Sequence, residues 1–282
     1  MRMDFSTKRV VYINLASHTS EVKSIPGLNK YIGGVSLGLR LLANDIEKDP
    51  VVFSIGPLNG FFPYVSKTSI VMHHQGVIED VYLGGSLSLR IKFMGIDAIV
   101  INGASKTPVI LEITDGDVAF KSMDVPIDTL GLPGKRSVIT FAGEKISHDS
   151  FFTTPETFLE TKLTEKNITG IVVTGSKTFS IKTAFKYEQL FNALLKQEDD
   201  MEVQKSDNPS CSGCPMGCKK SQVGEIGGNV LIHSLVACTF AQKIYSDVGI
   251  VFSCLNTLGY DYTHEDIENL PKLVEEIIKE LS

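Results

Sequence analysis

The residues best suited to chemistry are three cysteines within eight residues. Cys211, Cys214 and Cys218 have the spacing C-x2-C-x3-C, and no cysteine precedes them in the chain. Thiols three or four residues apart on a turn can face one point in space, as iron–sulfur clusters and zinc both require. Gly213 and Gly217 allow the backbone to approach closely. The spacing therefore predicts a site that binds a metal ion or an iron–sulfur cluster.

Sites of these two kinds usually take four ligands, so a fourth ligand is expected outside this segment. Cys238 and Cys254 follow it in the chain, and His233 would complete a zinc site with three cysteines and one histidine. Both later cysteines lie in apolar runs, where a cysteine is commonly a small core residue. The predicted metal set includes Cys254, with Cys238, His233 or a partner chain as the alternatives.

Composition and charge exclude several classes of protein. Lys and Arg number 27 against 33 Asp and Glu, a formal charge of -6 that does not supply the basic field of a nucleic-acid binder. Hydrophobic residues at 43% and charged residues at 21% are typical of a globular protein. No apolar run approaches the roughly 20 residues of a membrane span, and the first residues lack a signal peptide's pattern. We therefore expect a cytoplasmic protein with no nucleic-acid or membrane partner, in which cysteines do not form a disulfide framework.

The part of the chain before the cysteines reads as short strands separated by glycine. A helix is expected over 28–43, and the alternation over 86–93 favours a strand, with a short helix as the alternative. Asp115-Gly116-Asp117 indicates a hairpin between two of the strands. Strands are expected over 10–15, 51–55, 68–72, 98–101, 109–114, 118–121, 138–141 and 170–174.

From about residue 183 the pattern becomes helical. Helices are expected over 184–195, 231–254 and 266–281, the last opened by Thr263 as N-cap with Asp266 three residues later. Strands followed by helices predict an α+β fold. The expected organisation is a strand-rich N-terminal domain, residues 1–178, and a small helical domain, residues 179–282, that carries the cysteines.

Several segments, in collinear order, resemble the aldehyde:ferredoxin oxidoreductase family of tungsten or molybdenum pterin enzymes. The family's segments K-Y-L-G-G, T-G-P-L-T-G, N-A-G-G and C-x2-C-x3-C are matched, in turn, by residues 30–34, residues 54–60, Gly84-Gly85 and residues 211–218. The sequence from 254 to 261 is similar to the family's C-N-E-Y-G-L-D. The resemblance implies the family's N-terminal domain followed by a truncated part of its helical domain.

The resemblance also implies cofactors and residues that bind them. Cys211, Cys214 and Cys218 match three ligands of the family's [4Fe-4S] cluster. Lys67, Gly84 and Gly85 match positions that hold the tungstopterin or molybdopterin. In the family, the cluster passes electrons from the metal-pterin to ferredoxin. The resemblance assigns no catalytic residue to this chain.

Departures from the family's pattern predict that the pterin site is degraded. Lys67 replaces an arginine, so the bidentate hydrogen bonding of a guanidinium group is lost. Tyr82 replaces the asparagine that helps to hold magnesium in the family. The family's glycine-rich loop is replaced by residues 153–161, which contain no glycine and two acids that would repel phosphate. The family's enzymes are longer, and their last cluster cysteine lies in domains that this chain is expected to lack.

Two functions are consistent with these residues. The first is a short family-like protein that binds an iron–sulfur cluster and serves as an electron-transfer or oxidoreductase subunit. Its expected partners are ferredoxin or a chain that supplies the missing domains. Homodimers are common in the family, so a homodimer is a further expectation. The alternative is a non-catalytic structural or assembly partner, a pseudoenzyme with zinc or no metal at its cysteines.

Overall fold

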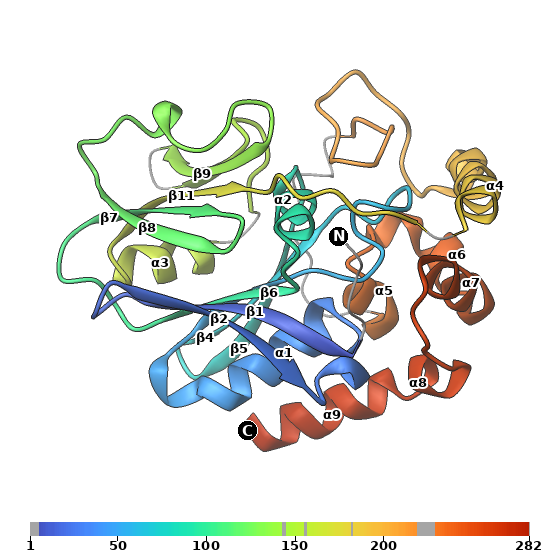
Figure 1. The fold of residues 1–282 in the computed structure, drawn as a ribbon, viewed down its shortest axis with the longest axis horizontal. Helices are drawn as coiled ribbons and strands as arrows, with labels where there is room; N and C mark the ends of the chain where they lie inside the picture. The colour runs from blue at the N-terminus through green and yellow to red at the C-terminus, as the bar shows by residue number, and fades with distance from the viewer. Residues whose placement is uncertain (1–5, 143–144, 155–156, 182, 219–228, 282) are drawn as a thin grey trace.

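The computed structural model describes residues 6–142, 145–154, 157–181, 183–218 and 229–281, and two mixed β-sheets form the centre of the fold (Figure 1). The first sheet has the order β2-β1-β6-β3-β4-β5. Its β1 and β6 are parallel, and the other neighbours are antiparallel. The strands are β1 (Thr7–Asn14), β2 (Thr19–Pro26), β3 (Val51–Ser54), β4 (Thr68–His74), β5 (Val77–Leu83) and β6 (Ala98–Asn102).

The second sheet has the order β10-β9-β11-β7-β8, with β7 and β11 parallel. The predicted hairpin between β7 and β8 is confirmed. Asp115 and Gly116 both have positive φ, the conformation of a type I′ turn that matches the twist of paired strands. The strands are β7 (Val109–Thr114), β8 (Asp117–Ser122), β9 (Arg136–Ala142), β10 (Lys145–His148) and β11 (Ile168–Thr174).

The largest apolar core lies between the two sheets and includes α2 (Leu87–Met94) and α3 (Phe158–Glu165). The prediction of a strand over 86–93 was wrong. Leu87, Ile91 and Met94 recur at helical spacing and are all at most 2% exposed, so they form one buried helix face. The alternation of apolar and basic residues was misleading because one of the basic residues, Lys92, is itself buried.

The opposite face of the first sheet is covered by α1 (Gly34–Asp45), and α9 (Leu270–Leu281) packs on α1 (Figure 1). Val10 belongs to the core under α1, whereas Val11 belongs to the core between the sheets, as alternation along a strand requires. Arg40 on α1 donates to both carboxylate oxygens of Glu280 at 2.7 and 2.9 Å.

The other helices gather at one end of the sheets. The prediction of a helix over 184–195 is confirmed, as is the Thr263–Asp266 capping box. The helix expected over 231–254 is interrupted at Val236, whose φ of 55° ends the first of three helices. These helices are α4 (Ala184–Leu195), α5 (Val230–Leu235), α6 (Gln242–Tyr245), α7 (Val248–Leu258) and α8 (His264–Glu268).

Buried lysines of the strand-rich part contact the helical part. Lys8 donates to the Tyr262 hydroxyl and Lys92 to the Tyr260 hydroxyl, both at 3.3 Å. The predicted α+β class is confirmed, and the division into residues 1–178 and 179–282 stays a prediction. None of the described helices has the length and apolar character needed to cross a membrane.

Candidate metal centre

The cysteine loop, residues 206–218, is closed by hydrogen bonds between its ends. The Ser206 N–H donates to the Met216 carbonyl at 2.8 Å, and the Ser206 hydroxyl donates to the Gly217 carbonyl. Gly217 has a φ of 55°, and a Cβ there would lie 2.3 Å from the Ser206 carbonyl oxygen. The glycine in the cysteine spacing is therefore required by the closure of the loop.

The three predicted thiol ligands lie in a largely dry environment. Cys211 and Cys218 are buried and Cys214 is half-buried. The Cys214 N–H donates to the Cys211 carbonyl at 3.0 Å, which forms a turn between the first two cysteines. Burial raises the pKa of Cys214 to about 12, and a hydrogen bond with the Met216 backbone opposes this shift. Cys211, Cys238 and Cys218 each raise that pKa further, so Cys238 belongs to the same electrostatic neighbourhood.

Cys238 reaches this neighbourhood through Tyr64. The Tyr64 N–H donates to the Gly213 carbonyl at 3.1 Å, and the Tyr64 carbonyl accepts from the Cys238 N–H at 3.0 Å. Burial raises the pKa of Cys238 to about 11, and the positive charge of Lys67 opposes this rise. One residue of the N-terminal part thus joins the cysteine loop to a fourth cysteine.

The other two candidates for a fourth ligand, Cys254 and His233, are buried on helices. Cys254 is fully buried in α7, and burial is what raises its pKa to about 12. His233 lies on α5, and burial lowers its pKa to about 4. Of the three candidates, Cys238 is the one whose backbone is tied to the cysteine loop.

The donor set suits a metal site, although its side chains are not arranged as one. Among the described residues, no three His, Cys, Asp or Glu side chains are placed to hold a metal ion, and all five cysteines are free thiols. Four neighbouring thiols are the ligand chemistry of both iron–sulfur and zinc sites. Binding would require each thiol to lose its proton and to turn toward a common centre.

The residues predicted to bind a pterin cofactor adjoin the same loop. The Ser212 N–H donates to the Gly85 carbonyl at 3.0 Å, so the cysteine loop contacts the Gly84-Gly85 turn directly. The Lys67 N–H donates to the Val236 carbonyl at 3.1 Å, two residues before Cys238, and the Lys67 side chain is buried. The structure therefore brings the Gly84-Gly85 turn to the cysteine loop and Lys67 to the segment before Cys238.

The Gly84-Gly85 turn is packed against a buried histidine. His148 Nδ1 lies 2.7 Å from the Gly84 carbonyl oxygen, and its Nε2 lies 2.5 Å from the Ser137 hydroxyl. Burial lowers the pKa of His148, so the neutral ring donates from Nδ1 and accepts at Nε2. A Cβ at Gly85 would lie 2.4 Å from the His148 ring. This side of the turn is therefore filled by the protein itself.

Sequence reasoning missed His148 and Tyr64, and neither position carried a local signal. His148 contacts a turn 64 residues earlier in the chain, and Tyr64 bridges two segments at least 149 residues later. Such contacts follow from the packing of the sheets and not from residue spacing. The Gly85 carbonyl and the cysteine loop meet only once the fold has formed.

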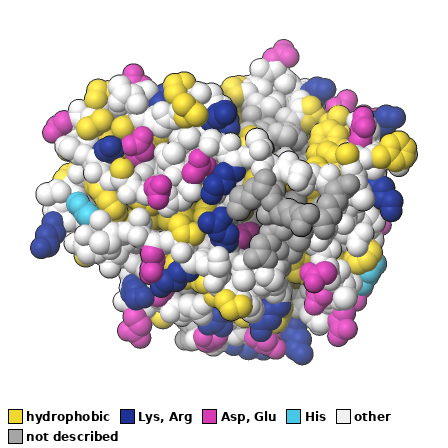
Figure 2. All heavy atoms as spheres, viewed as in Figure 1, with side chains coloured by type: hydrophobic (Ala, Val, Ile, Leu, Met, Phe, Trp, Pro, Cys, Tyr) yellow, Lys and Arg dark blue, Asp and Glu magenta, His cyan; other side chains and the backbone are white. Residues whose placement is uncertain are grey.

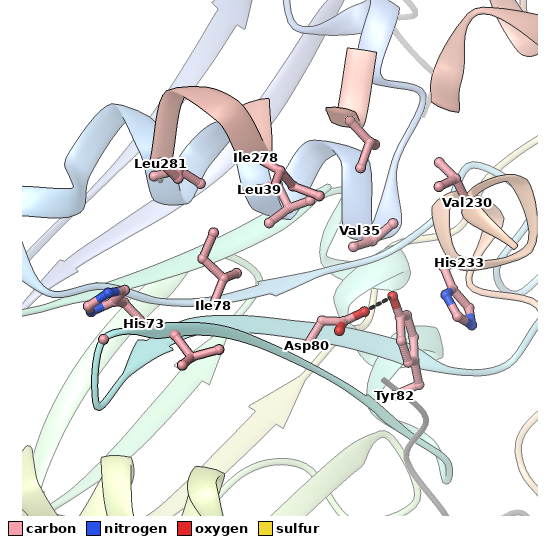
Figure 3. Close-up of a pocket in the computed structure, with 13 residues that line it drawn as sticks. Val35, Leu39, His73, Ile78, Asp80, Tyr82, Val230, His233, Ile278 and Leu281 are labelled. Atoms are coloured by element: carbon pink, nitrogen blue, oxygen red, sulfur yellow. Dashed lines mark hydrogen bonds between the residues drawn. The ribbon is translucent and has the colours of Figure 1, made fainter. Parts of the chain in front are cut away.

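A separate pocket of about 600 Å³ lies between α1, the β4–β5 hairpin, α5 and α9 (Figure 3). Tyr82, which stands where the family has an asparagine, donates to Asp80 at 2.5 Å. The His233 ring stacks on Tyr82 with 4.0 Å between ring centroids, and its Nε2 is buried with no hydrogen-bond partner. Tyr82 and His233 are therefore parts of this pocket wall.

The unpartnered His233 predicts acid sensitivity. In the unfolded chain a histidine takes up a proton near pH 6.5, whereas folded His233 does so only near pH 4. Between these values the unfolded state binds more protons, so stability falls as the pH falls, by about 3 kcal/mol in total. His233→Phe keeps the ring stack and removes the titration, so its stability should fall less over this range in urea unfolding at each pH.

His148 titrates in the same direction, so the variant should flatten the pH profile without abolishing its slope. Profiles of the wild type and His233→Phe that stay parallel from pH 6.5 to 4 would contradict the assignment.

Comparison with known proteins identifies the N-terminal part. Residues 10–147 match the family described as "Aldehyde ferredoxin oxidoreductase, N-terminal domain". A stretch of 108 residues is 33% identical to the "Aliphatic sulfonate oxidoreductase, WOR-like subunit" of Pyrococcus furiosus, covering 33% of this chain and 17% of that protein. A longer alignment of 246 residues is 24% identical to the "Tungsten-containing aldehyde ferredoxin oxidoreductase" of the same organism, covering 73% of this chain.

The chain spans less than two fifths of each of these relatives, 17% and 38% of their lengths. The fold is also similar to a chain of the "Active site complex BamBC of Benzoyl Coenzyme A reductase in complex with 1,5 Dienoyl-CoA", with a TM-score of 0.64 and 13% identity. That match covers all of this chain and 64% of the other. At this identity it supports the fold alone.

Proposed function

Because residues 10–147 form an N-terminal domain of the aldehyde ferredoxin oxidoreductase family, we propose that this chain is an iron–sulfur subunit of a family-like oxidoreductase. The observation that carries the proposal is the cysteine loop, whose backbone is hydrogen-bonded to the family domain between Ser212 and Gly85 and between Gly213 and Tyr64. A cluster held there would take up and release one electron at a time.

The protein's own residues would prepare this site in two ways. Burial of Cys211 and Cys218 keeps bulk water away from the thiols. Lys67 lowers the pKa of Cys238 relative to burial alone, so its positive charge favours the thiolate that binds iron. Burial and the charge of Lys67 act in opposite directions on the Cys238 thiol, and a bound cluster would supply further positive charge to buried thiolates.

A pterin cofactor is not part of the proposed mechanism. The Gly84 carbonyl is hydrogen-bonded to His148, and the His148 ring occupies the space beside Gly85. Tyr82, which stands in place of the family's asparagine, donates a hydrogen bond from its hydroxyl to Asp80. Together with the acidic substitute for the glycine-rich loop, of which residues 155–156 lie outside the described part, these contacts support a degraded pterin site.

The subunit role also requires a partner chain. The name of one relative describes it as a subunit, and the similar structure is described as an active site complex. On this protein, Phe185 on α4 is 71% exposed, and Figure 2 shows hydrophobic side chains at the surface over α4. Such exposure supports α4 as part of a contact with a chain that supplies catalytic domains or accepts electrons.

The test is a metal count on protein purified without oxygen. We expect about four irons and matching sulfide per chain, no stoichiometric tungsten or molybdenum, and an electron paramagnetic resonance signal after reduction. The second candidate function, a non-catalytic structural or assembly partner, is favoured by the packing of His148 into the Gly84-Gly85 turn. One zinc per chain, or no metal, would replace the first proposal by the second.

A further inference from the structure

The strand β2 is an open edge of the first sheet (Figure 1). It pairs along its whole length with β1, and on its other side it has no paired strand within the described part of the chain. All of its residues except Ile25 are exposed. An exposed edge strand presents backbone N–H and C=O groups to which a further strand can add.

The other edges of the two sheets, as far as the structure describes them, are less open. The strand β10 has four residues, β5 has three buried residues, and β8 is half-buried between its two ends. The strand β2 has eight residues, and Val22 near its centre is 40% exposed. An exposed hydrophobic residue on a long edge strand favours pairing with another strand. Of these edges, β2 is therefore the best suited to accept one.

The charges on β2 suit a second copy of the same strand. Glu21 and Lys23 lie on one face of the sheet, where Lys23 Nζ is 2.6 Å from Glu21 Oε1, and both side chains are more than half exposed. Val22 lies between them and points to the opposite face. An edge with charges of one sign would repel its copy, whereas an acid and a base can each face the opposite charge across a two-fold axis.

These charges also select the register of such a pair. Two antiparallel copies related by a two-fold axis must place one residue opposite its own copy, because opposed residues point to the same face. With Val22 at the centre, Glu21 faces Lys23 of the second copy, and Lys23 faces Glu21 of the second copy. With Glu21 or Lys23 at the centre, like charges would face each other, which is destabilising. In the register centred on Val22, Pro26 would face His18, outside the strand, so its missing N–H costs no ladder hydrogen bond.

We propose that two copies of this chain pair through β2, antiparallel and about a two-fold axis at Val22, so that their first sheets join into one. Backbone hydrogen bonds hold the two strands together. The two ion pairs and the contact between the two Val22 side chains fix the register. The inference goes beyond the proposed function and requires no metal, so either proposal can fail without the other.

The first test measures the mass of the full chain by sedimentation velocity over a range of micromolar concentrations, and we expect a dimer for the wild type. Glu21→Lys and Lys23→Glu should each weaken dimerisation at least about tenfold, since either change replaces two attractive pairs by two repulsive ones. The combined variant, Glu21→Lys with Lys23→Glu, should restore the dimer because every pair is again complementary. Glu268→Lys makes the same change of charge at an exposed position on α8 and should leave the dimer intact.

Cross-linking tests the register. Val22→Cys places two thiols directly opposite each other, close enough for a disulfide between the copies under mild oxidation. Ser24→Cys is the control on the same face, because it would face Ser20 of the second copy and should not cross-link. The native cysteines are buried or half-buried, and the oxidised wild type shows their contribution.

Circular dichroism shows whether each variant is folded, and all the substituted side chains are exposed. A wild type that stays monomeric at the highest concentration would overturn the proposal, as would a dimer that survives both single charge reversals. Cross-linking of Ser24→Cys without cross-linking of Val22→Cys would overturn the pairing about Val22.

Discussion

Replacement of Cys214 by serine is expected to abolish retention of iron by this protein. Cys214 is the central cysteine of the loop, and its pKa responds to the three other thiols, Cys211, Cys238 and Cys218. A hydroxyl is a far poorer ligand for iron than a thiolate, so the site would lose one of its proposed thiolate ligands. Iron and sulfide counts after anaerobic reconstitution measure the effect.

The matched control is Ser212→Ala in the same loop. Ser212 contacts Gly85 through its backbone N–H, which alanine keeps, so iron content should equal that of the wild type. Equal iron in Cys214→Ser and in the wild type would remove the cysteine loop from the metal site. A loss of iron in both variants would mean that the loop is sensitive to any change, and not that Cys214 is a ligand.

Replacement of Gly56 by alanine is expected to destabilise the fold by about 3 kcal/mol or more. A Cβ at Gly56 would lie 2.0 Å from the Leu235 carbonyl oxygen, and one at Gly34 would lie 2.1 Å from the His233 carbonyl oxygen. Both contacts are with backbone at the end of α5, which cannot move away as a flexible side chain could. Overpacking of a fixed neighbour costs about 1–3 kcal/mol, and contacts this short lie at the upper end or beyond.

Urea or thermal unfolding of Gly56→Ala measures this cost, which corresponds to a lower midpoint by roughly 6–12 °C for a chain of this size. The control is Gly249→Ala at the start of α7, where the nearest atom to the new Cβ is the Asp247 side chain at 3.1 Å. Alanine favours a helix over glycine by about 1 kcal/mol, so this variant should be neutral or slightly stabilised. Equal effects at the two positions would contradict the steric explanation.

The glycine segments shared with the family therefore have a packing role that the sequence could not reveal. Gly34 belongs to the segment 30–34, and Gly56 belongs to the segment 54–60. Each permits the end of α5 to approach the backbone of the N-terminal part closely. The helix that meets these glycines lies about 180–200 residues later in the chain, so no local pattern indicates the contact.

The accuracy of the predicted elements followed the strength of their local signals. The hairpin at Asp115-Gly116 and the capping box at Thr263 were predicted correctly because turn and cap residues act on their immediate neighbours. The helix α2 was missed because Lys92 is buried, with its ammonium donating to the Pro57 carbonyl. Burial of a lysine depends on partners distant in sequence, which the alternation over 86–93 does not indicate.

The candidate site was predictable only in part for the same reason. The spacing of Cys211, Cys214 and Cys218 is local, so the sequence alone indicates the loop. A choice between Cys238 and Cys254 requires knowledge of where α5 ends and which segment faces the loop. Helical periodicity across 231–254 concealed that end, because Val236 adopts its left-handed conformation under tertiary constraint.

The order of strands in the first sheet has a consequence for synthesis on the ribosome. The strand β6 lies between β1 and β3, yet it is the last strand of that sheet to be translated. The β1–β2 hairpin and the β3–β4–β5 meander can each form early. They are joined only through β6, which pairs with β1 on one side and with β3 on the other, so they stay separate until Ala98–Asn102 emerges. The nascent chain must therefore carry two incomplete sheets with open edges, which chaperones would recognise, until one five-residue strand joins them.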